Sequence, residues 1–369
     1  MNKRKICIVT GSRAEYGLLY PLIKKVNEDD TVELQLLVTG SHLVKEFGFT
    51  YKEIEKNFKI DKKIDILSYA NSVGIAKSMA KAQIEFTKTF KKFNPDIVVL
   101  LGDRYEIFSV AVSATILNIP IAHIHGGEAT YGANDEVYRH AITKMSHLHF
   151  TATKEYKKRV IQLGEAPDRV KNVGAIGLDH LSRSSFMTLD ELSKSLNFAI
   201  NHPYILVTYH PVTLADEEPE QSFQALLDSL DEFPDYQIIL TYPNADDGGR
   251  RIIPLLEGYA SKNSKRTLAI KSLGQIRYLS AVKNAAAVVG NSSSGIIEVP
   301  SFDVATIDIG MRQRGRLAAK SVIHCSSKKN DIVNAINYGI HKTYKVSDEK
   351  IHNPYGQGDA TVRPPGSAP

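Results

Sequence analysis

Short runs of β-branched and aliphatic residues alternate along the chain with longer segments that carry apolar residues at helical spacing. In the first half this pattern predicts strands over 5–10, 32–39, 96–101 and 119–124 and helices over 75–93 and 106–117. In the second half it predicts strands over 204–209, 237–241, 285–289 and 304–309 and helices over 217–230 and 273–282. The alternation is typical of βαβ units, so we predict an α/β fold with two parallel sheets.

The length of 369 residues exceeds one ordinary core and favours two domains. We expect a first domain over 1–185, a second over 186–350 and a C-terminal tail over 351–369. A serine-rich, weakly patterned stretch between residues 180 and 203 is interpreted as a linker region. The end of the tail contains three prolines and a glycine and cannot propagate a helix.

Composition narrows the class of protein. Hydrophobic residues make up 43% and charged residues 24% of the chain, and the net charge of +5 is scattered, so nucleic acid is not the expected partner. Cys7 and Cys325 offer no disulfide framework, which favours a reducing compartment. The apolar run over 6–9 is too short for a signal peptide and no stretch is long enough for a membrane span, so we expect a cytoplasmic protein.

Polar residues follow the predicted strands of the first half. The carboxyl ends of parallel strands line one crevice, so the segments 10–13, 39–42, 102–104 and 123–128 should converge there. This region is dense in groups that can move protons: Asp103, His123, His125, Glu128, Asp135, Glu136 and His140. Asp135 and Glu136 could instead only cap a helix. The alternating histidines make a metal site conceivable, but nothing indicates three converging ligands, and we predict none.

The turn over 11–17 matches neither the dinucleotide-binding glycine motif nor the phosphate loop, so dehydrogenase and ATPase functions lose support. Arg13 in this turn is a candidate anion contact. A second candidate is the small-residue turn after a strand formed by Asn291, Ser292, Ser293, Ser294 and Gly295, which would hold phosphate or simply open a helix.

Three further residues of the second half fit a nucleotide. Glu298, expected on the first turn of the following helix, could accept hydrogen bonds from ribose hydroxyls or interact with the helix dipole. Arg312 lies in an arginine-rich loop suited to phosphate, or simply in a solvated loop. His210, at a strand end, could donate to a phosphate, act as an acid or only stabilise a turn.

Seven motifs in order, over 10–17, 38–43, 101–106, 123–128, 135–147, 208–212 and 290–298, closely resemble those of the hydrolysing UDP-N-acetylglucosamine 2-epimerases of sialic-acid-type pathways. The resemblance runs from the first strand to about residue 355. It implies a glycosyltransferase-B-like architecture, with two Rossmann-like domains whose parallel sheets face a central cleft and the uridine nucleotide on the second domain. It implies no cofactor and no metal, and a dimer or tetramer.

The resemblance also implies a reaction. UDP-N-acetylglucosamine and water would become N-acetylmannosamine and UDP, by elimination of UDP through a 2-acetamidoglucal and then hydration. One alternative is the same reaction on UDP-2,4-diacetamido-2,4,6-trideoxyglucose. Others are a non-hydrolysing 2-epimerase, a glycosyltransferase, and a catalytically silent nucleotide-sugar sensor.

Residue roles follow from the matching motifs. Asp103 and Asp135 match positions associated with catalysis in the family. The positions that match nucleotide or sugar contacts are Arg13, His42, His210, Ser292, Ser293, Glu298 and Arg312. Some relatives have Glu where His125 stands. One proton transfer is therefore left unassigned, and His125, Glu128 and Glu136 are the candidates for it. Relatives also continue past residue 356 into a final helix, whereas this chain has a proline-rich end.

Overall fold

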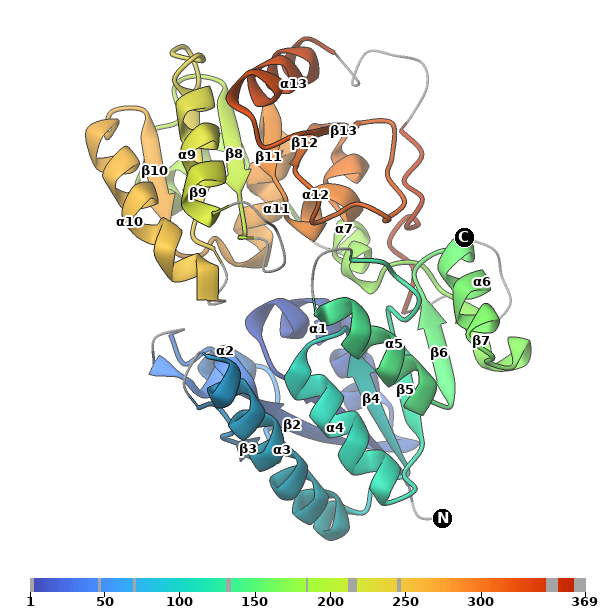
Figure 1. Ribbon diagram of the computed structural model, residues 1–369. Helices are drawn as coiled ribbons and strands as arrows, with labels where there is room; N and C mark the ends of the chain where they lie inside the picture. Colours follow the sequence, from blue (N-terminus) through green and yellow to red (C-terminus); the bar gives the residue numbers. More distant parts are fainter. Residues whose placement is uncertain are drawn as a thin grey trace. The chain divides into compact units, whose positions relative to one another are not determined.

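The computed structural model describes residues 3–45, 48–68, 71–130, 134–183, 185–211, 218–243, 247–342 and 351–361 (Figure 1). The chain divides into two compact units. Unit 1 comprises Met1–Glu128, Asn134–Ser182 and Tyr355–Pro369, and unit 2 comprises Ala129–Ala133 and Arg183–Pro354. This division differs from the ranges expected from the sequence in the short segment Ala129–Ala133 and in the C-terminal segment.

Unit 1 contains a parallel sheet of seven strands in the order β3-β2-β1-β4-β5-β6-β7. The strands are β1 (Arg4–Thr10), β2 (Val32–Thr39), β3 (Lys62–Ile64), β4 (Ile97–Leu101), β5 (Ile121–Ile124), β6 (Leu148–Thr151) and β7 (Val170–Asn172). Strand order reverses between β1 and β4, which pair with Ile8 beside Val99. Such a reversal leaves a crevice at the carboxyl ends of the two strands.

Helices cover both faces of this sheet. They are α1 (Arg13–Glu28), α2 (Tyr51–Glu55), α3 (Ser72–Phe93), α4 (Tyr105–Ile116), α5 (Asp135–Met145), α6 (Lys154–Gln162) and α7 (Asp179–Arg183), with short 3₁₀ turns η1 (Gly40–Leu43), η3 (Pro167–Arg169) and η4 (Ile176–Leu178). Neighbouring strand residues face opposite sides: Cys7 and Val9 pack in the core with α3 and α4, and Ile8 packs with α1 (Figure 1). Both faces are therefore apolar, as a parallel sheet requires.

Unit 2 repeats the arrangement with six parallel strands in the order β10-β9-β8-β11-β12-β13. The strands are β8 (Tyr204–Thr208), β9 (Gln237–Thr241), β10 (Thr267–Ile270), β11 (Ala287–Gly290), β12 (Ala305–Ile309) and β13 (Val322–Cys325). The helices are α8 (Leu189–Leu196), α9 (Pro219–Leu230), α10 (Asp247–Lys262), α11 (Gly274–Asn284), α12 (Ser293–Ile297) and α13 (Lys329–His341), with the 3₁₀ turn η5 (Val299–Phe302). Strand order reverses between β8 and β11.

The predicted fold class is confirmed, because each unit is a parallel α/β sheet. Every strand and helix predicted from the pattern is present, apart from shifts at the ends. The first residue of the helix predicted over 217–230 lies outside the described residues. The short strands β3, β6, β7, β10 and β13 were not predicted. The serine-rich stretch is not an irregular linker, since it contains α8, whose capping box joins Thr188 and Glu191.

The C-terminal segment over 355–361 packs on unit 1. The side chain of Tyr355 is fully buried, and its hydroxyl lies 2.8 Å from that of Tyr156. The carboxylate of Asp179 accepts hydrogen bonds from the backbone N–H groups of Ala360 (2.7 Å) and Thr361 (2.8 Å). This part of the predicted tail therefore contributes to the core of unit 1, while residues 362–369 lie outside the described part.

Among the described residues no helix is both long enough and apolar enough to cross a membrane. Cys7 and Cys325 are both free thiols, and Cys7 is buried in the first sheet.

Candidate functional site

The candidate residues form two clusters, one in each unit, and each cluster lies where the strand order reverses. In unit 1, Gly11 follows β1 and Asp103 follows β4. In unit 2, His210 follows β8 and Asn291 follows β11. In parallel α/β sheets, the crevice outside the carboxyl ends of the strands at such a reversal is where ligands bind.

Arg139 is the centre of the cluster in unit 1. Its side chain is 1% exposed and ion-paired with Asp103 and, at 2.9 Å, with Oε2 of Glu136. Its Nη1 also donates to the carbonyl oxygen of Glu128 at 3.0 Å. A buried guanidinium holds its carboxylate partners in a fixed orientation, so this cluster is not a loosely solvated surface.

The segment over 125–128 has an unusual backbone. His125 has φ of +67°, a left-handed conformation that is strained for a residue with a side chain. Gly127 has φ of +79°, and a Cβ there would lie 2.5 Å from the carbonyl oxygen of Tyr156. Nδ1 of His125 lies 2.8 Å from Oε1 of Glu128, while its Nε2 is buried and has no hydrogen-bond partner among the described residues. The turn thus leaves one buried imidazole nitrogen without a hydrogen-bond partner in the described part of the chain.

Two more predicted residues lie at the start of α5. Asp135 is its first residue and is half-buried. Oε1 of Glu136 lies 3.0 Å from Nε2 of His140, so Glu136 bridges this imidazole and Arg139. The structure therefore brings Asp103, Glu128 and Glu136 together through one arginine.

His123 has a structural role beside this cluster. Its Nε2 lies 2.8 Å from the carbonyl oxygen of Gly102, which can only accept, so Nε2 carries the hydrogen. Its Nδ1 then accepts from the hydroxyl of Thr143 at 3.2 Å. Burial lowers the pKa of His123 to about 4. The neutral ring fixes the β4 turn that carries Asp103.

The turn after β1 contains Arg13 and contacts His42. Ser12 caps α1, and Arg13 is the first residue of that helix. Nε2 of His42 lies 3.0 Å from the hydroxyl of Thr10, and its Nδ1 lies 2.7 Å from that of Thr50. Burial lowers the pKa of His42 to about 4, so the ring is neutral at pH 7.

In unit 2, Asn291 clamps the backbone of His210. Its Oδ1 accepts from the His210 N–H and its Nδ2 donates to the His210 carbonyl, each at 2.7 Å. Gly290 before it has φ of +140°, and a Cβ there would lie 2.0 Å from the carbonyl oxygen of Thr208. The ends of β8 and β11 are thereby joined, and only glycine fits at the junction.

Arg312 lies at the same place, since its Nη1 donates to the carbonyl oxygen of Asn291 at 3.0 Å. Burial lowers the pKa of His210 to about 3, and the positive charge of Arg312 acts in the same direction. His210 is therefore neutral and can donate a hydrogen bond to an anion, whereas its predicted alternative role as an acid is disfavoured.

The small-residue turn opens a short helix, as expected. Ser292 caps α12, and Ser293 and Ser294 begin it. Gly295 packs against Thr306, where a Cβ would lie 2.7 Å from Cγ2. Because α12 ends at Ile297, Glu298 lies at its C-terminal cap, and the prediction that placed it in the first turn was wrong.

Four residues of these clusters were missed from the sequence. Arg139 lies on an expected helix but offers no local signal of its partners. Glu15 and Glu106 resemble ordinary helix-start carboxylates. Tyr278 lies inside a predicted helix, yet its hydroxyl and that of Ser294 are both buried and have no hydrogen-bond partner among the described residues. Its pKa is raised by burial and by the nearby Glu298.

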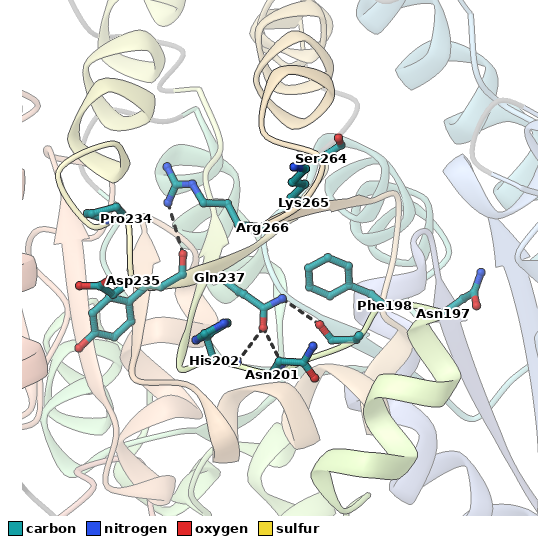
Figure 2. Close-up of a pocket in the computed structure, with 12 residues that line it drawn as sticks. Asn197, Phe198, Asn201, His202, Pro234, Asp235, Gln237, Ser264, Lys265 and Arg266 are labelled. Carbon is teal, nitrogen blue, oxygen red and sulfur yellow. Dashed lines mark hydrogen bonds between the residues drawn. The ribbon is translucent and has the colours of Figure 1, made fainter.

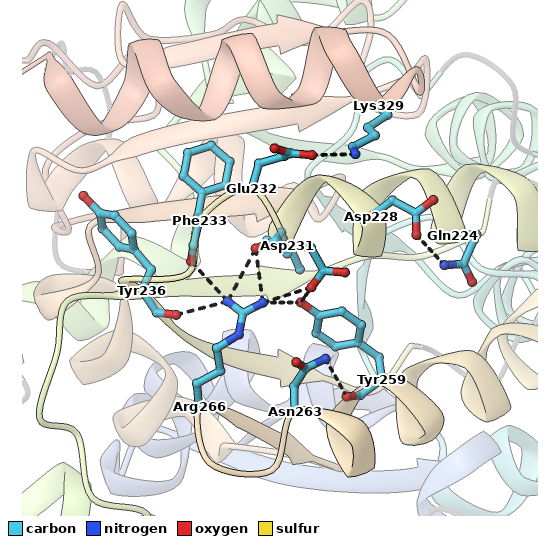
Figure 3. Close-up of polar contacts among 11 residues, drawn as sticks. Gln224, Asp228, Asp231, Glu232, Phe233, Tyr236, Tyr259, Asn263, Arg266 and Lys329 are labelled. Atoms are coloured by element: carbon cyan, nitrogen blue, oxygen red, sulfur yellow. Dashed lines mark hydrogen bonds and ion pairs between the residues drawn. The ribbon is translucent and has the colours of Figure 1, made fainter.

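A pocket of about 470 Å³ lies elsewhere in unit 2, at the amino ends of β8 and β9 (Figure 2). The polar groups drawn in it are largely occupied. Gln237 accepts from the N–H groups of Asn201 and His202 and donates to the carbonyl of Ala199. Arg266 at its edge donates to the carbonyls of Phe233 and Tyr236 and to other groups at the end of α9 (Figure 3). This pocket is therefore structural and does not contain the predicted residues.

Within the part of the chain that the structure describes, no group of three or more His, Cys, Asp or Glu is placed to hold a metal ion.

Comparisons with known proteins show which family the chain belongs to. Residues 24–364 match the sequence profile of a family described as UDP-N-acetylglucosamine 2-epimerase. The chain is 43% identical over 346 residues to the GDP/UDP-N,N'-diacetylbacillosamine 2-epimerase (hydrolyzing) of Campylobacter jejuni, covering 94% of this chain and 90% of the relative. It is 41% identical over 362 residues to the polysialic acid biosynthesis protein P7 of Escherichia coli, covering 97% and 92%.

A solved structure has the same fold. The UDP-GlcNAc 2-epimerase of Neisseria meningitidis, crystallised with UDP-GlcNAc, superposes with a TM-score of 0.81 over 97% of each chain at 19% identity. The glycosyltransferase-B-like architecture expected from the sequence is confirmed by this likeness and by the two parallel sheets.

Proposed function

Because the chain belongs to the UDP-N-acetylglucosamine 2-epimerase family, we propose that it is a hydrolysing 2-epimerase of a UDP-linked 2-acetamido sugar. C2 of the sugar loses a proton and C1 loses UDP, which leaves a C1–C2 double bond. Water then adds its hydroxyl to C1, and C2 receives a proton on the opposite face. The products are UDP and the free sugar inverted at C2.

The observation that carries this proposal is the buried Arg139 that holds Asp103 and Glu136 where the strand order of unit 1 reverses. Removing a weakly acidic proton from carbon needs a base in fixed position. Asp103 and Asp135 are the proposed proton-transfer carboxylates. His125, whose Nε2 has no partner among the described residues, is proposed to carry the second proton with Glu128 behind it.

Unit 2 supplies the groups proposed to hold UDP. A leaving diphosphate is stabilised by cations and by neutral donors that need no reorganisation. Arg312 supplies the cation, and neutral His210 supplies a ring N–H. The serine hydroxyls of the turn over 292–294 and the carboxylate of Glu298 complete the nucleotide subsite proposed on unit 2. In unit 1, Arg13 is proposed as an anion contact and His42 as a sugar-side contact.

The proposed substrate is the 2,4-diacetamido-2,4,6-trideoxy sugar, and this choice is supported by 43% identity to a relative named for diacetylbacillosamine. UDP-N-acetylglucosamine is the second candidate, because the chain is 41% identical to a polysialic acid biosynthesis protein. Both sugars carry the 2-acetamido group, so the same residues would serve either reaction.

The test is a proton NMR time course in D₂O with each sugar linked to UDP and, for the first sugar, also to GDP. We expect release of the free nucleoside diphosphate and a product that carries deuterium at C2. Nucleotide that stays attached to the inverted sugar would show a non-hydrolysing epimerase instead. No turnover of any of these compounds would reject the proposal.

Variants of Asp103 and Asp65 connect the activity to the site. Asp103→Asn should lower kcat by about 10²- to 10⁴-fold while UDP binding is kept. Asp65→Asn is the matched control, because Asp65 is largely exposed and forms a surface ion pair with Lys81. Equal activity of the two variants would contradict the assignment of Asp103.

A further inference from the structure

Two glutamates that the proposed chemistry does not use meet where β1 and β4 diverge. Glu15 lies in the first turn of α1, and Glu106 lies in the first turn of α4. Both side chains are buried, with exposed fractions of 8% and 2%. Glu15 is two residues after Arg13, and Glu106 is three residues after Asp103, and both of these neighbours belong to the proposed site.

Each glutamate uses one oxygen to hold a neighbouring turn. Oε2 of Glu15 accepts the backbone N–H of Gly11 at 2.7 Å, and Oε1 of Glu106 accepts from Nε of Arg104 at 2.7 Å. The two carboxylates flank Gly11: a Cβ there would lie 3.4 Å from each of these oxygens and 3.0 Å from Cγ of Glu106. The absence of a side chain at Gly11 is what lets the pair approach.

The second carboxyl oxygen of each glutamate has no hydrogen-bond partner in the described part of the chain. Oε1 of Glu15 and Oε2 of Glu106 are buried without a hydrogen-bond partner among the described residues. Two buried carboxylates beside one paired arginine are electrostatically costly when both are charged. A proton on Glu15 removes one charge and turns one unmet acceptor into a donor.

The electrostatics favour that proton. Burial raises the pKa of Glu15 to about 7, and the carboxylate of Glu106 acts in the same direction. The N–H of Gly11, the charge of Arg104 and the hydroxyl of Ser12 oppose the shift and are outweighed.

Three other ionisable groups belong to this turn. Arg13 and Tyr16 come from α1, and His42 comes from η1. Burial keeps His42 neutral at pH 7 and raises the pKa of Tyr16 to about 12. Arg104 is a cation that contacts the pair, through Oε1 of Glu106.

We propose that Glu15 and Glu106 form a carboxyl pair in which Glu15 carries a proton, and that this pair positions Arg104 beside Asp103 and holds the turn that carries Arg13. The inference rests on the proposed function for its effect on turnover, but not for the existence of the pair. Both glutamates are positioning residues that act through the turns they hold.

A capping role alone would look different. In the capping box of α8, Oε2 of Glu191 returns to the N–H of the capping residue Thr188 at 2.8 Å, and Glu191 lies at the surface. Glu15 instead reaches past its capping residue Ser12 to Gly11 and points toward a second buried carboxylate. Glu191 is therefore a matched control that caps a helix without a partner of this kind.

The first test is infrared spectroscopy of the full chain in D₂O, which detects the carbonyl stretch of a protonated carboxylic acid without any substrate. The difference between the wild type and Glu15→Gln should show this band at pH 6 and lose it by pH 9. The difference between the wild type and Glu191→Gln should show no such band. Absence of the band for Glu15 at pH 6 would overturn the pair even if the enzyme is active.

The second test follows nucleotide release against pH. In the wild type kcat should decrease above about pH 7 as Glu15 ionises, and Glu15→Gln, which cannot ionise, should lack this step. Glu106→Gln and Gly11→Ala should lower kcat by about 10- to 100-fold with KM within about threefold, because Arg104 is displaced. Glu191→Gln should keep the wild-type profile.

The outcomes separate the two proposals. Turnover with an identical pH profile in the wild type and Glu15→Gln would reject the role of the pair in turnover and leave the epimerase assignment intact. An infrared band without turnover of any nucleotide sugar would reject the proposed function and leave the pair intact.

Discussion

Arg139 lies on α5 and Asp103 lies in the turn between β4 and α4, yet the two side chains form an ion pair. Arg139 is 1% exposed, so its charge is balanced mainly by the carboxylates that it contacts. Because Asp103 is more exposed, at 23%, the pair has one buried member that fixes and one accessible member that can react. This division suits a carboxylate that must keep one orientation during proton transfer.

Replacing Arg139 should affect both stability and activity. Arg139→Met removes the buried cation that pairs with Asp103 and Glu136, so we expect a loss of about 3–5 kcal/mol in the free energy of unfolding, measured by urea denaturation. Arg139→Lys keeps the charge but cannot contact all acceptors at once, so an intermediate loss is expected. A change of less than about 1 kcal/mol for Arg139→Met would contradict the central role of this residue.

Asn291 should matter for nucleotide affinity. Asn291→Ala removes both hydrogen bonds to the backbone of His210 and leaves two buried polar groups unpaired, at about 1–3 kcal/mol each. We expect the Kd for UDP, measured by calorimetry, to rise about 10- to 100-fold. Asn263→Ala is the control, because the side-chain amide of Asn263 donates to the carbonyl of Tyr259 in the last turn of α10, outside the His210 turn. Equal affinities would show that the clamp is not used in binding.

Arg266 should stabilise unit 2 without a part in the chemistry. It joins the end of α9 to β10 through several carbonyls and Asp231 (Figure 3). Arg266→Met should therefore cost about 2–4 kcal/mol and increase hydrogen exchange of α9. Arg251→Met should cost much less, because its ion pairs with Glu218 and Glu220 lie at the surface. A loss of protection confined to unit 1 would contradict this assignment.

Acid should destabilise the protein through its buried histidines. His42 and His123, with pKa values of about 4, and His210, with a pKa of about 3, are held neutral when folded, whereas the usual value is about 6.5. The unfolded chain therefore binds more protons below pH 6.5. Stability should be constant with respect to these groups above pH 6.5 and fall between pH 6.5 and 4, by about 1.4 kcal/mol per pH unit for each histidine.

Urea denaturation at several pH values tests this slope. His123→Gln should remove about one third of the combined slope. His202→Gln should leave it unchanged, because His202 is exposed. A free energy of unfolding that is the same at pH 7 and pH 5 in the wild type would contradict the prediction.

Local patterns were sufficient for most of the fold. The central strands, such as β1 and β8, are continuous apolar runs because both of their faces are covered, and this makes them visible in the sequence. The edge strands β3 and β13 have few buried residues and carry no comparable signal. The helix α8 was missed because its serines obscure the two buried leucines, Leu192 and Leu196.

The part of the candidate site that directly follows predicted strands could be predicted from the sequence. Asp103, His125 and Asn291 each follow an apolar run, and each parallel sheet gathers such residues at the carboxyl ends of its strands. Asp103 and His125 belong to the sheet of unit 1, and Asn291 belongs to the sheet of unit 2. The position of Glu298 in the helix was misjudged because the length of α12 depends on the 3₁₀ turn that follows it, which no periodicity indicates.

The amino-acid sequence by itself determined the two parallel sheets and the polar residues at their carboxyl ends, because alternation and turn residues act over a few positions. Only the tertiary structure decided which of these residues meet. The order of the strands places β1 beside β4, and this brings Glu15 to Glu106, while the packing of α5 brings Arg139 to Asp103. Such pairs join positions that are dozens of residues apart, and their proximity depends on the packing of whole elements rather than on local spacing.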